Sequence, residues 1–441
     1  RVASDNREVF EEGLFIPPVK LYDAGVLNKA VLEMIRWNVR TPEEVTGDLR
    51  SQVAANHVCA EKIVEMMADE GLSTLDDLAD EIIARTERSM RRAIQAIPNG
   101  TYPFEGVIEG SGNREDIKIK LTVGVEESDI LVDFNGTAPQ VGWGVNVVYN
   151  FTYAYVFMAI KSAFDPDLPI NEGAIRPVKM TAPEGSVVNC SFPAAVAARM
   201  QVGHFMTEMV FRALSAATPD RIIAGSGGTP AQTNIFYGKR HNGKPWHTMI
   251  IRGGGLGAGK RQDGHHCAIF PANGANTPVE ILESDTPLLV ESRELLCDSG
   301  GAGTHRGGLG RRMQLRIPDD ETAPIPPVAI AVQAGRFQYP PEGFFGGRSG
   351  AKAGFSINGN KGDPGGLTFT SPGDVITFDS AGGGGFGNPL ERDIAAVERD
   401  VKFEYVSIRQ AEAVYGVIID PVSGRTDREA SRVLRAKKRN R

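Results

Sequence analysis

Residues 253–310 are unusually rich in glycine and in short polar motifs. They read GGGLGAG at 253–259, DGHH at 263–266, NTPVE at 276–280 and DSGGAGTHRGGLG at 298–310. Glycine lacks a Cβ, so it adopts backbone angles that other residues avoid and lets a ligand approach the main chain closely. Loops of this kind often carry binding and catalytic residues. We therefore expect tightly bent backbone around a polar pocket in this segment.

Asp263, His265 and His266 place one acid and two bases within four positions. Such groups can supply a general base, a proton shuttle or metal ligands. Neighbouring side chains of an extended segment point to opposite faces, so the two imidazoles do not easily serve one site. The sequence favours His265, because it shares a face with Asp263. The structural alternative, in which one histidine caps a loop, stays open.

Asn276 and Glu280 flank a Thr-Pro-Val sequence. The proline holds the residue before it in an extended conformation, so the amide and the carboxylate lie on a stiff loop. A stiff loop orients polar groups toward a substrate with little loss of entropy on binding. The alternative is that Asn276 satisfies turn backbone and that Glu280 pairs with Arg261 or Arg293.

Four further polar residues are candidates for binding a substrate. Asn171 and Glu172 lie on another turn, and Arg199 could bind a carboxylate, bicarbonate or phosphate through two nitrogens. His305 follows a glycine-rich stretch and is a candidate for lining a pocket. Side chains like those of Asn171, Glu172 and Arg199 are more often structural hydrogen-bonding groups, so this alternative also stays open.

Hydrophobic spacing divides the chain into four regions. We expect a mainly helical segment over residues 1–100, a mixed strand and helix region over 101–220, a glycine-rich β region over 221–390, and a helix, strand and helix over 391–441. The fold class that this predicts is α+β. In the first region an apolar helical stripe ends at Gly71, and we expect His57 on that stripe to be a hydrogen-bonded core residue.

Individual elements are predicted where the periodicity is clear. Residues 117–125 alternate between apolar and polar side chains, which is typical of a half-buried strand. Residues 147–164 and 203–217 are apolar enough for buried helices. Further strands are expected at 328–332, 367–370, 375–378 and 414–419.

Composition excludes some functions. The net charge is −7, and the only dense basic run is at residues 435–441. Because nucleic-acid binding depends mainly on clustered Lys and Arg, we expect no nucleic-acid partner. No apolar run approaches the roughly 20 residues needed to span a bilayer, so we expect no membrane partner. The four cysteines are widely separated, without the spacing of a metal site, which fits a cytoplasmic location.

The glycine-rich motifs, together with EGLFIPPVKL at 12–21, resemble the hydantoinase B family. The resemblance extends over nearly the whole chain through GDLR at 47–50, INEG at 170–173, PEGS at 183–186 and GGGGFGNP at 382–389. The family includes subunits of ATP-dependent hydantoin and lactam hydrolases and of acetone and acetophenone carboxylases. Asn388 stands where the family motif is expected to have Asp.

The resemblance implies a subunit of an ATP-dependent amidohydrolase that opens a cyclic amide, such as a hydantoin, 5-oxoproline or a lactam. It implies a divalent metal, Zn or Mn, with ligands in an N-terminal segment that this sequence looks to be missing. It also implies a hydantoinase A type partner that binds ATP, and the chain itself has no strong nucleotide-binding motif. One alternative is a subunit of an acetone or acetophenone type carboxylase, and another is a non-catalytic scaffold subunit.

The candidate residues fall into two groups under this interpretation. The predicted catalytic residues are Asp263, His265 and Glu280. The predicted substrate-binding residues are Asn276, His266, Asn171, Glu172, Arg199 and His305.

Overall fold

A computed structural model describes residues 5–439, apart from residues 111, 113, 320, 321 and 323. The first part of the chain is helical, as predicted, after a short turn η1 (Val9–Glu11) and a small hairpin of β1 (Tyr22–Asp23) and β2 (Val26–Leu27). Its helices are α1 (Lys29–Asn38), α2 (Pro42–Asp69) and α3 (Asp76–Gln95). The chain turns after α2 at Gly71, whose φ of +65° is favourable only for glycine among common residues.

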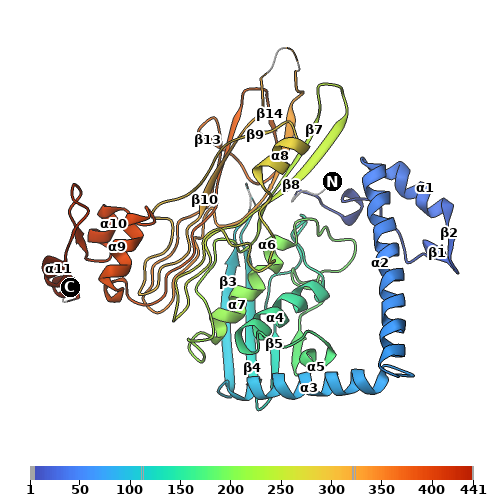
Figure 1. The fold of residues 1–441 in the computed structure, drawn as a ribbon, viewed down its shortest axis with the longest axis horizontal. Coiled ribbons are helices and arrows are strands. Elements are labelled where there is room, and N and C mark those ends of the chain that lie inside the picture. The colour runs from blue at the N-terminus through green and yellow to red at the C-terminus, as the bar shows by residue number, and fades with distance from the viewer. Residues whose placement is uncertain (1–4, 111, 113, 320–321, 323, 440–441) are drawn as a thin grey trace.

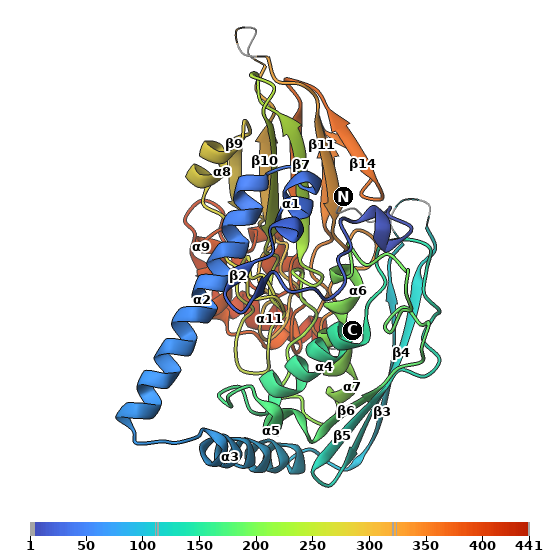
Figure 2. The same cartoon turned by 90° about the vertical axis from the view of Figure 1, so that its right-hand side faces the viewer.

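The expectation for His57 was wrong. Its side chain is 77% exposed, and its Nε2 lies 3.3 Å from the carboxylate of Glu61 on the next turn of α2. Several apolar residues of the same helix, among them Val64, are also exposed. The physical reason is that α2 packs mainly against α1 and runs along one side of the molecule (Figures 1 and 2). The hydrophobic period identified the helix, but it did not show that few other elements pack against α2.

The central region contains a four-stranded sheet in the order β3-β4-β5-β6. Its strands are β3 (Gly100–Ile108), β4 (Ile117–Glu126), β5 (Asp129–Asp133) and β6 (Val178–Thr181), and only β5 and β6 pair in parallel. The alternation predicted over 117–125 is confirmed, because every second residue of β4 is buried.

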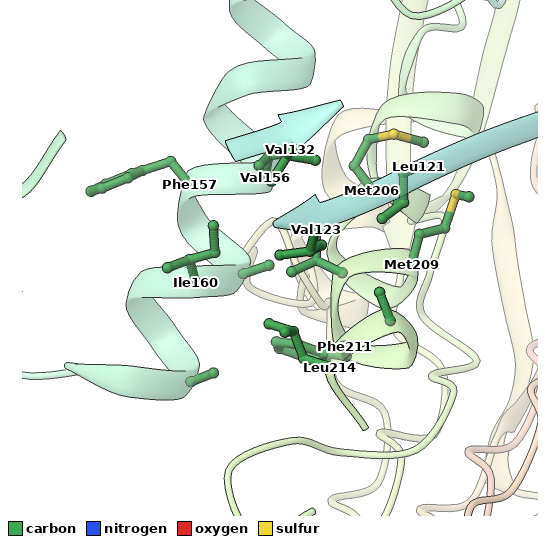
Figure 3. Packing of buried hydrophobic residues seen from close by; sticks show 14 of the residues in the cluster. Leu121, Val123, Val132, Val156, Phe157, Ile160, Met206, Met209, Phe211 and Leu214 are labelled. Atoms are coloured by element: carbon green, nitrogen blue, oxygen red, sulfur yellow. The ribbon is translucent and has the colours of Figure 1, made fainter. Parts of the chain in front are cut away.

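Helices cover the buried face of this sheet. They are α4 (Tyr149–Phe164), α5 (Glu172–Ile175), α6 (Met200–Gly203) and α7 (Phe205–Leu214). Figure 3 shows Ile160 of α4, Val123 of β4 and Met209 of α7 in one packed core. Ile94 of α3 belongs to the same cluster, so the first hundred residues share a core with the region that follows them.

Two more sheets form the part of the molecule at the top of Figure 1. One has the order β14-β11-β7-β8 and the other the order β13-β12-β15-β10-β9. Phe236 and Phe378 meet between them, with ring centroids 6.3 Å apart, in a second hydrophobic core. The strands are β7 (Gln232–Lys239), β8 (Pro245–Arg252), β9 (Leu289–Leu295), β10 (Arg311–Arg316), β11 (Val328–Gln333), β12 (Gly354–Ile357), β13 (Asn360–Lys361), β14 (Leu367–Thr370) and β15 (Val375–Asp379).

Below these sheets, the glycine-rich segments pack against one another without forming a sheet. Consecutive amides of residues 383–385 donate to three different segments, at the carbonyl groups of Gly308, Gly225 and Arg348. The amide of Phe386, three residues after Gly383, returns to the first of these segments at His305. A repeat of three residues is the period of a polyproline II helix, which has no internal hydrogen bonds and leaves its amides free for neighbours.

The chain ends in a small unit that packs on the opposite side of the molecule from α2 (Figure 1). It comprises η2 (Pro389–Glu391), α9 (Ile394–Lys402), α10 (Ile408–Ala413), β16 (Ile418–Ile419), β17 (Thr426–Asp427) and α11 (Arg428–Arg439). The strand predicted at 414–419 is shorter than expected, because the chain turns tightly after α10 at Gly416, where φ is +63°. The basic run at 435–441 lies on α11 up to Arg439, and residues 440 and 441 lie outside the described part.

The α+β fold class is confirmed by this mixture of helices and small sheets. Within the described residues, no helix combines the length and the apolar composition needed to cross a bilayer.

Glycine is required in the packed segments because any side chain would meet backbone. A Cβ at Gly255 would lie 1.9 Å from the carbonyl oxygen of Gly308, whereas a Cβ at the exposed Gly142 would meet nothing within 4 Å. We predict that Gly255→Ala lowers the free energy of unfolding by about 3 kcal/mol, since backbone cannot move aside as a side chain can. Gly142→Ala serves as the control and should be near neutral. Urea denaturation measures both, and equal stability of the two variants would contradict the packing argument.

Candidate functional site

Asp263 lies at the edge of the glycine-rich layer and binds the guanidinium group of Arg392. The two nitrogens of Arg392 donate to the two carboxylate oxygens of Asp263, at 2.6 Å each. The amide of Arg306 donates to the same carboxylate at 2.7 Å. Burial by itself would raise the pKa of Asp263, but the hydrogen bonds and charge of Arg392, helped by Arg306, lower it below its ordinary value. Asp263 is therefore a firmly ionised carboxylate.

A second carboxylate completes a balanced ionic cluster. Asp400 on α9 accepts from Arg392 at 2.7 Å and from Arg306 at 3.3 Å. All three side chains are almost fully buried. The two acids are therefore paired with two buried arginines, with the exposed Arg399 4.0 Å from Asp263, and these ion pairs fasten α9 to the glycine-rich layer.

The three predicted histidines surround this cluster unequally. The imidazole that pairs with Asp263 is His305, with 3.8 Å between Nδ1 and the carboxylate. His266 accepts the amide of Leu309 at its Nδ1 over 2.9 Å, so when neutral it carries its proton on Nε2. Burial, with the charge of Arg306, lowers the pKa of His266 to about 4. His265 is exposed. The sequence favoured His265 because it would share a face with Asp263, but the histidine that lies beside Asp263 is His305.

Asn276 and Glu280 lie on the loop that leads into α8 (Val279–Asp285) and on its first turn. The amide nitrogen of Asn276 donates to the carbonyl of Cys267 at 3.3 Å, and its buried Oδ1 has no partner among the described residues. Glu280 is exposed. The arginines considered as its partners are engaged elsewhere, Arg293 with the carbonyl of Thr277 and Arg261 with Asp220.

The remaining predicted residues lie in the central region and do not join the Asp263 cluster. Asn171 caps α5 through the amide of Gly173 and accepts the hydroxyl of Thr86 at 2.6 Å. Glu172 pairs with Arg176 at 3.0 Å. These contacts match the structural alternative for both residues.

Arg199 directly precedes α6, and its guanidinium carbon lies 5.1 Å from the ring centre of Phe151. It stands beside a buried histidine, His204. His204 accepts the amide of Ala231 at Nδ1 over 3.1 Å, and its Nε2 lies 2.9 Å from the hydroxyl of Tyr155. Burial, and then the charge of Arg199, lower the pKa of His204 to about 4. Arg199 and His204 therefore share one polar environment inside the helical layer.

One turn further along α7, Glu208 lies at a cavity of about 280 Å³. Its carboxylate binds the guanidinium group of Arg336, which also donates to the carbonyl of Thr229 at 2.7 Å. Arg336 has a φ of +75°, an unfavourable conformation for a residue with a side chain. The rest of the lining is largely apolar and includes Phe104, Ile108 and Met209.

This cavity has the chemistry expected of a small-molecule site, with apolar walls and a few converging charged groups. A second arginine, Arg212, reaches the cavity and pairs with Glu342 at 2.6 Å. Sequence reasoning missed these residues, although one signal was available. Glu208 is a lone acid within the apolar run at 203–217, and an acid in such a run is seldom buried without a function or a partner.

The described residues do not fit the divalent metal that the resemblance implies. No group of three or more His, Cys, Asp or Glu side chains in the described part of the chain could hold a metal ion. Asp263, the acid that lies beside His305, is already bound by Arg392. No chemical step is therefore assigned to a metal at these residues.

Asp263 allows a direct test of the ionic cluster. We predict that Asp263→Ala lowers the free energy of unfolding by about 3 kcal/mol, because it leaves the buried Arg392 without half of its negative partners. Asp220→Ala is the control, since its partner Arg261 is exposed and such pairs contribute less than about 1 kcal/mol. Equal denaturation midpoints for the two variants would argue against a structural role for Asp263.

His204 makes stability depend on pH. Its folded pKa of about 4 lies below the ordinary 6.5, so the unfolded chain takes up a proton that the folded chain excludes. Stability that is complete above pH 6.5 is therefore lost as the pH falls toward 4, by about 1.4 kcal/mol per pH unit from this group. Urea denaturation at pH 7 and pH 5 measures the loss. It should be smaller in His204→Gln and unchanged in the exposed control His241→Gln; an unchanged loss in His204→Gln would contradict the assignment.

Comparisons with known proteins agree with one another. A family model described as Hydantoinase B/oxoprolinase matches residues 1–389. One subunit of a putative D-/L-hydantoinase from Pseudomonas sp. (strain NS671) is 31% identical over 94% of this chain and 72% of its own. The crystal structure of the ATP-dependent caprolactamase from Pseudomonas jessenii superimposes with a TM-score of 0.88 at 27% identity, covering 99% of this chain and 77% of that one.

A nucleotide-free acetone carboxylase has the same fold, with a TM-score of 0.84 at 20% identity over 100% of this chain and 65% of that chain. The family match covers most of the sequence, and the hydantoinase relative is similar over nearly all of it. This chain belongs to the hydantoinase B/oxoprolinase family.

Proposed function

We propose that this chain is a subunit of an ATP-dependent hydrolase that opens a cyclic amide. The observation that carries the proposal is the similarity over 99% of the chain to a protein described as an ATP-dependent caprolactamase. The similarity to the putative D-/L-hydantoinase supports the same class of substrate, since hydantoins and lactams both contain a ring amide.

The chemistry explains why ATP is needed. An unstrained amide is a poor electrophile at neutral pH, and phosphorylation of its oxygen makes the ring carbon more electrophilic. Water can then add to that carbon, the ring C–N bond breaks as the nitrogen takes up a proton, and hydrolysis of the resulting acyl phosphate releases phosphate. The hydantoinase and caprolactamase relatives are each named as one subunit of a larger enzyme, which supports a partner chain. We propose that a hydantoinase A type partner binds ATP. A cytoplasmic location and a Zn or Mn ion stay predictions from the sequence.

Two sets of residues are available for this reaction. The cavity beside Glu208 and Arg336 offers apolar walls for a small ring and charged groups for its polar edge. We propose Glu280 and His265 as residues that meet a substrate or the partner, because both side chains are exposed, Glu280 on the first turn of α8 and His265 on a loop. Asp263 is better suited to a positioning role, since its carboxylate already holds Arg392 and the amide of Arg306.

The hydrolase proposal is tested by measuring ATP turnover and ring opening of the full-length protein purified together with its partner. Hydantoins, 5-oxoproline, lactams and ketones are compared with and without bicarbonate. We expect ATP consumption with a cyclic amide and no requirement for bicarbonate. Turnover that needs both a ketone and bicarbonate would replace the hydrolase by a carboxylase. Absence of turnover with every substrate, in a complex whose partner binds ATP, would favour a scaffold role.

Glu280 gives the cleanest test of a catalytic role, because its substitution does not disturb a buried ion pair. We predict that Glu280→Ala lowers kcat by a factor on the order of 100 or more, as expected for loss of a general acid or base. Glu283→Ala on the same helix is the matched control and should keep its activity. Equal activity of both variants, with unchanged thermal midpoints, would remove Glu280 from the site.

A further inference from the structure

Two arginines are buried between the two upper sheets, at the end nearest the glycine-rich layer. Arg252 is the last residue of β8 and is 1% exposed, and Arg311 is the first residue of β10 and is 4% exposed. Ser380 contacts the side chain of Arg252 and the main chain of Arg311, and the guanidinium carbon of Arg252 also lies 4.6 Å from the ring centre of Phe378. Arg252 donates to the Ser380 hydroxyl at 3.2 Å, and the Ser380 amide donates to the carbonyl of Arg311 at 2.8 Å.

Neither guanidinium group has an acidic partner. Among the described residues no ion pair involves Arg252 or Arg311, and the Nε atom of each is buried without a hydrogen-bond partner. The carboxylate whose charge acts on Arg252 is Asp379, and Arg312 holds both of its oxygens at 2.8 Å. Arg392, by contrast, binds two aspartates.

Two side-chain amides with unpaired polar atoms lie on the same face of the sheet as Arg252. Gln232 of β7 is directly opposite Arg252 in the antiparallel register, and Asn234 is two residues further along that strand. Residues opposite each other, and residues two apart, point to the same face of a sheet. Both side chains are fully buried, and Gln232 Oε1 and both polar atoms of Asn234 have no partner among the described residues. Donors and acceptors are therefore both available.

The charges of Arg252 and Arg311 are not neutralised by titration at pH 7. Burial, and then the charge of Arg311, lower the pKa of Arg252 to about 9, and burial with the charge of Arg293 lowers that of Arg311 to about 10. Both groups remain cationic at neutral pH. Buried charge without a counterion is strongly unfavourable, so this pair of arginines is suited to an anion.

We propose that Arg252, Arg311, Gln232 and Asn234 bind a small oxyanion of the bicarbonate or hydrogen phosphate type. The planar guanidinium group suits oxyanions because it can donate two parallel hydrogen bonds. A protonated oxyanion also carries an O–H group, which the free oxygens of Gln232 and Asn234 can accept. The small exposure of both arginines favours a free ion over a segment of another chain. The site does not depend on the cyclic-amide assignment.

The first experiment measures thermal midpoints of the full chain in phosphate and in bicarbonate, with chloride making up a constant ionic strength. We expect a saturable rise for the wild type with one or both oxyanions. Arg311→Met should lose the saturable rise and, without oxyanion, be at least as stable as the wild type, because an uncompensated charge has been removed. Arg261→Met is the control, since that arginine is 81% exposed, and it should keep the rise. A rise that does not saturate, or that persists in Arg311→Met, would overturn the proposal.

A second measurement needs no variant of the buried arginines. The charge of Arg311 favours the thiolate form of Cys267, although burial raises the pKa of that thiol overall. An oxyanion beside Arg311 would weaken this effect, so we expect phosphate or bicarbonate to slow alkylation of Cys267 by iodoacetamide several-fold. Peptide mass spectrometry follows Cys267, with the exposed Cys297 as the internal control. Unchanged alkylation of Cys267 at saturating oxyanion would argue against binding at this place. Both readouts are independent of turnover, so their failure is distinct from failure of the hydrolase proposal.

Discussion

Direct contact between glycine backbones is the constraint on which the other parts of this molecule depend. The segment 382–387 donates hydrogen bonds to three neighbouring segments in turn, and a Cβ at Gly383 would lie 2.1 Å from the carbonyl oxygen of Leu256. A polyproline II segment repeats every three residues, so its amides can donate hydrogen bonds in three directions. A β-strand cannot do this, because its amides alternate between two sides. The layer therefore connects the upper sheets, the central helices and the C-terminal unit through main-chain bonds.

The buried arginines at the border of this layer differ in whether they have acidic partners. Arg392 binds both Asp263 and Asp400, and Arg306 binds Asp400, so these buried arginines have acidic partners and the ion pairs hold α9 in place. Arg252 and Arg311 have no such partners. Because burial of charge is unfavourable in both cases, the first arrangement is explained by structure, and the second calls for a ligand.

The candidate cavity shows the same dependence on distant parts of the chain. Glu208 comes from α7 and Arg336 from a loop after β11, and they meet although 128 residues separate them. His204, one turn before Glu208, bonds to the amide of Ala231 on the loop into β7. Local sequence did not mark Arg336, because nothing near Arg336 in the chain shows which acid it meets.

The sequence by itself determined the α+β class, the helical first hundred residues, the half-buried strand at 117–125 and the family. These follow from hydrophobic period, glycine content and ordered motifs, which are local properties. Only the tertiary structure decided that Asp263 is bound by Arg392, that His57 is exposed and that Arg252 has no acidic partner among the described residues. The reason is that burial and charge pairing depend on which segments meet in space, and contacts between residues far apart in sequence leave no local pattern.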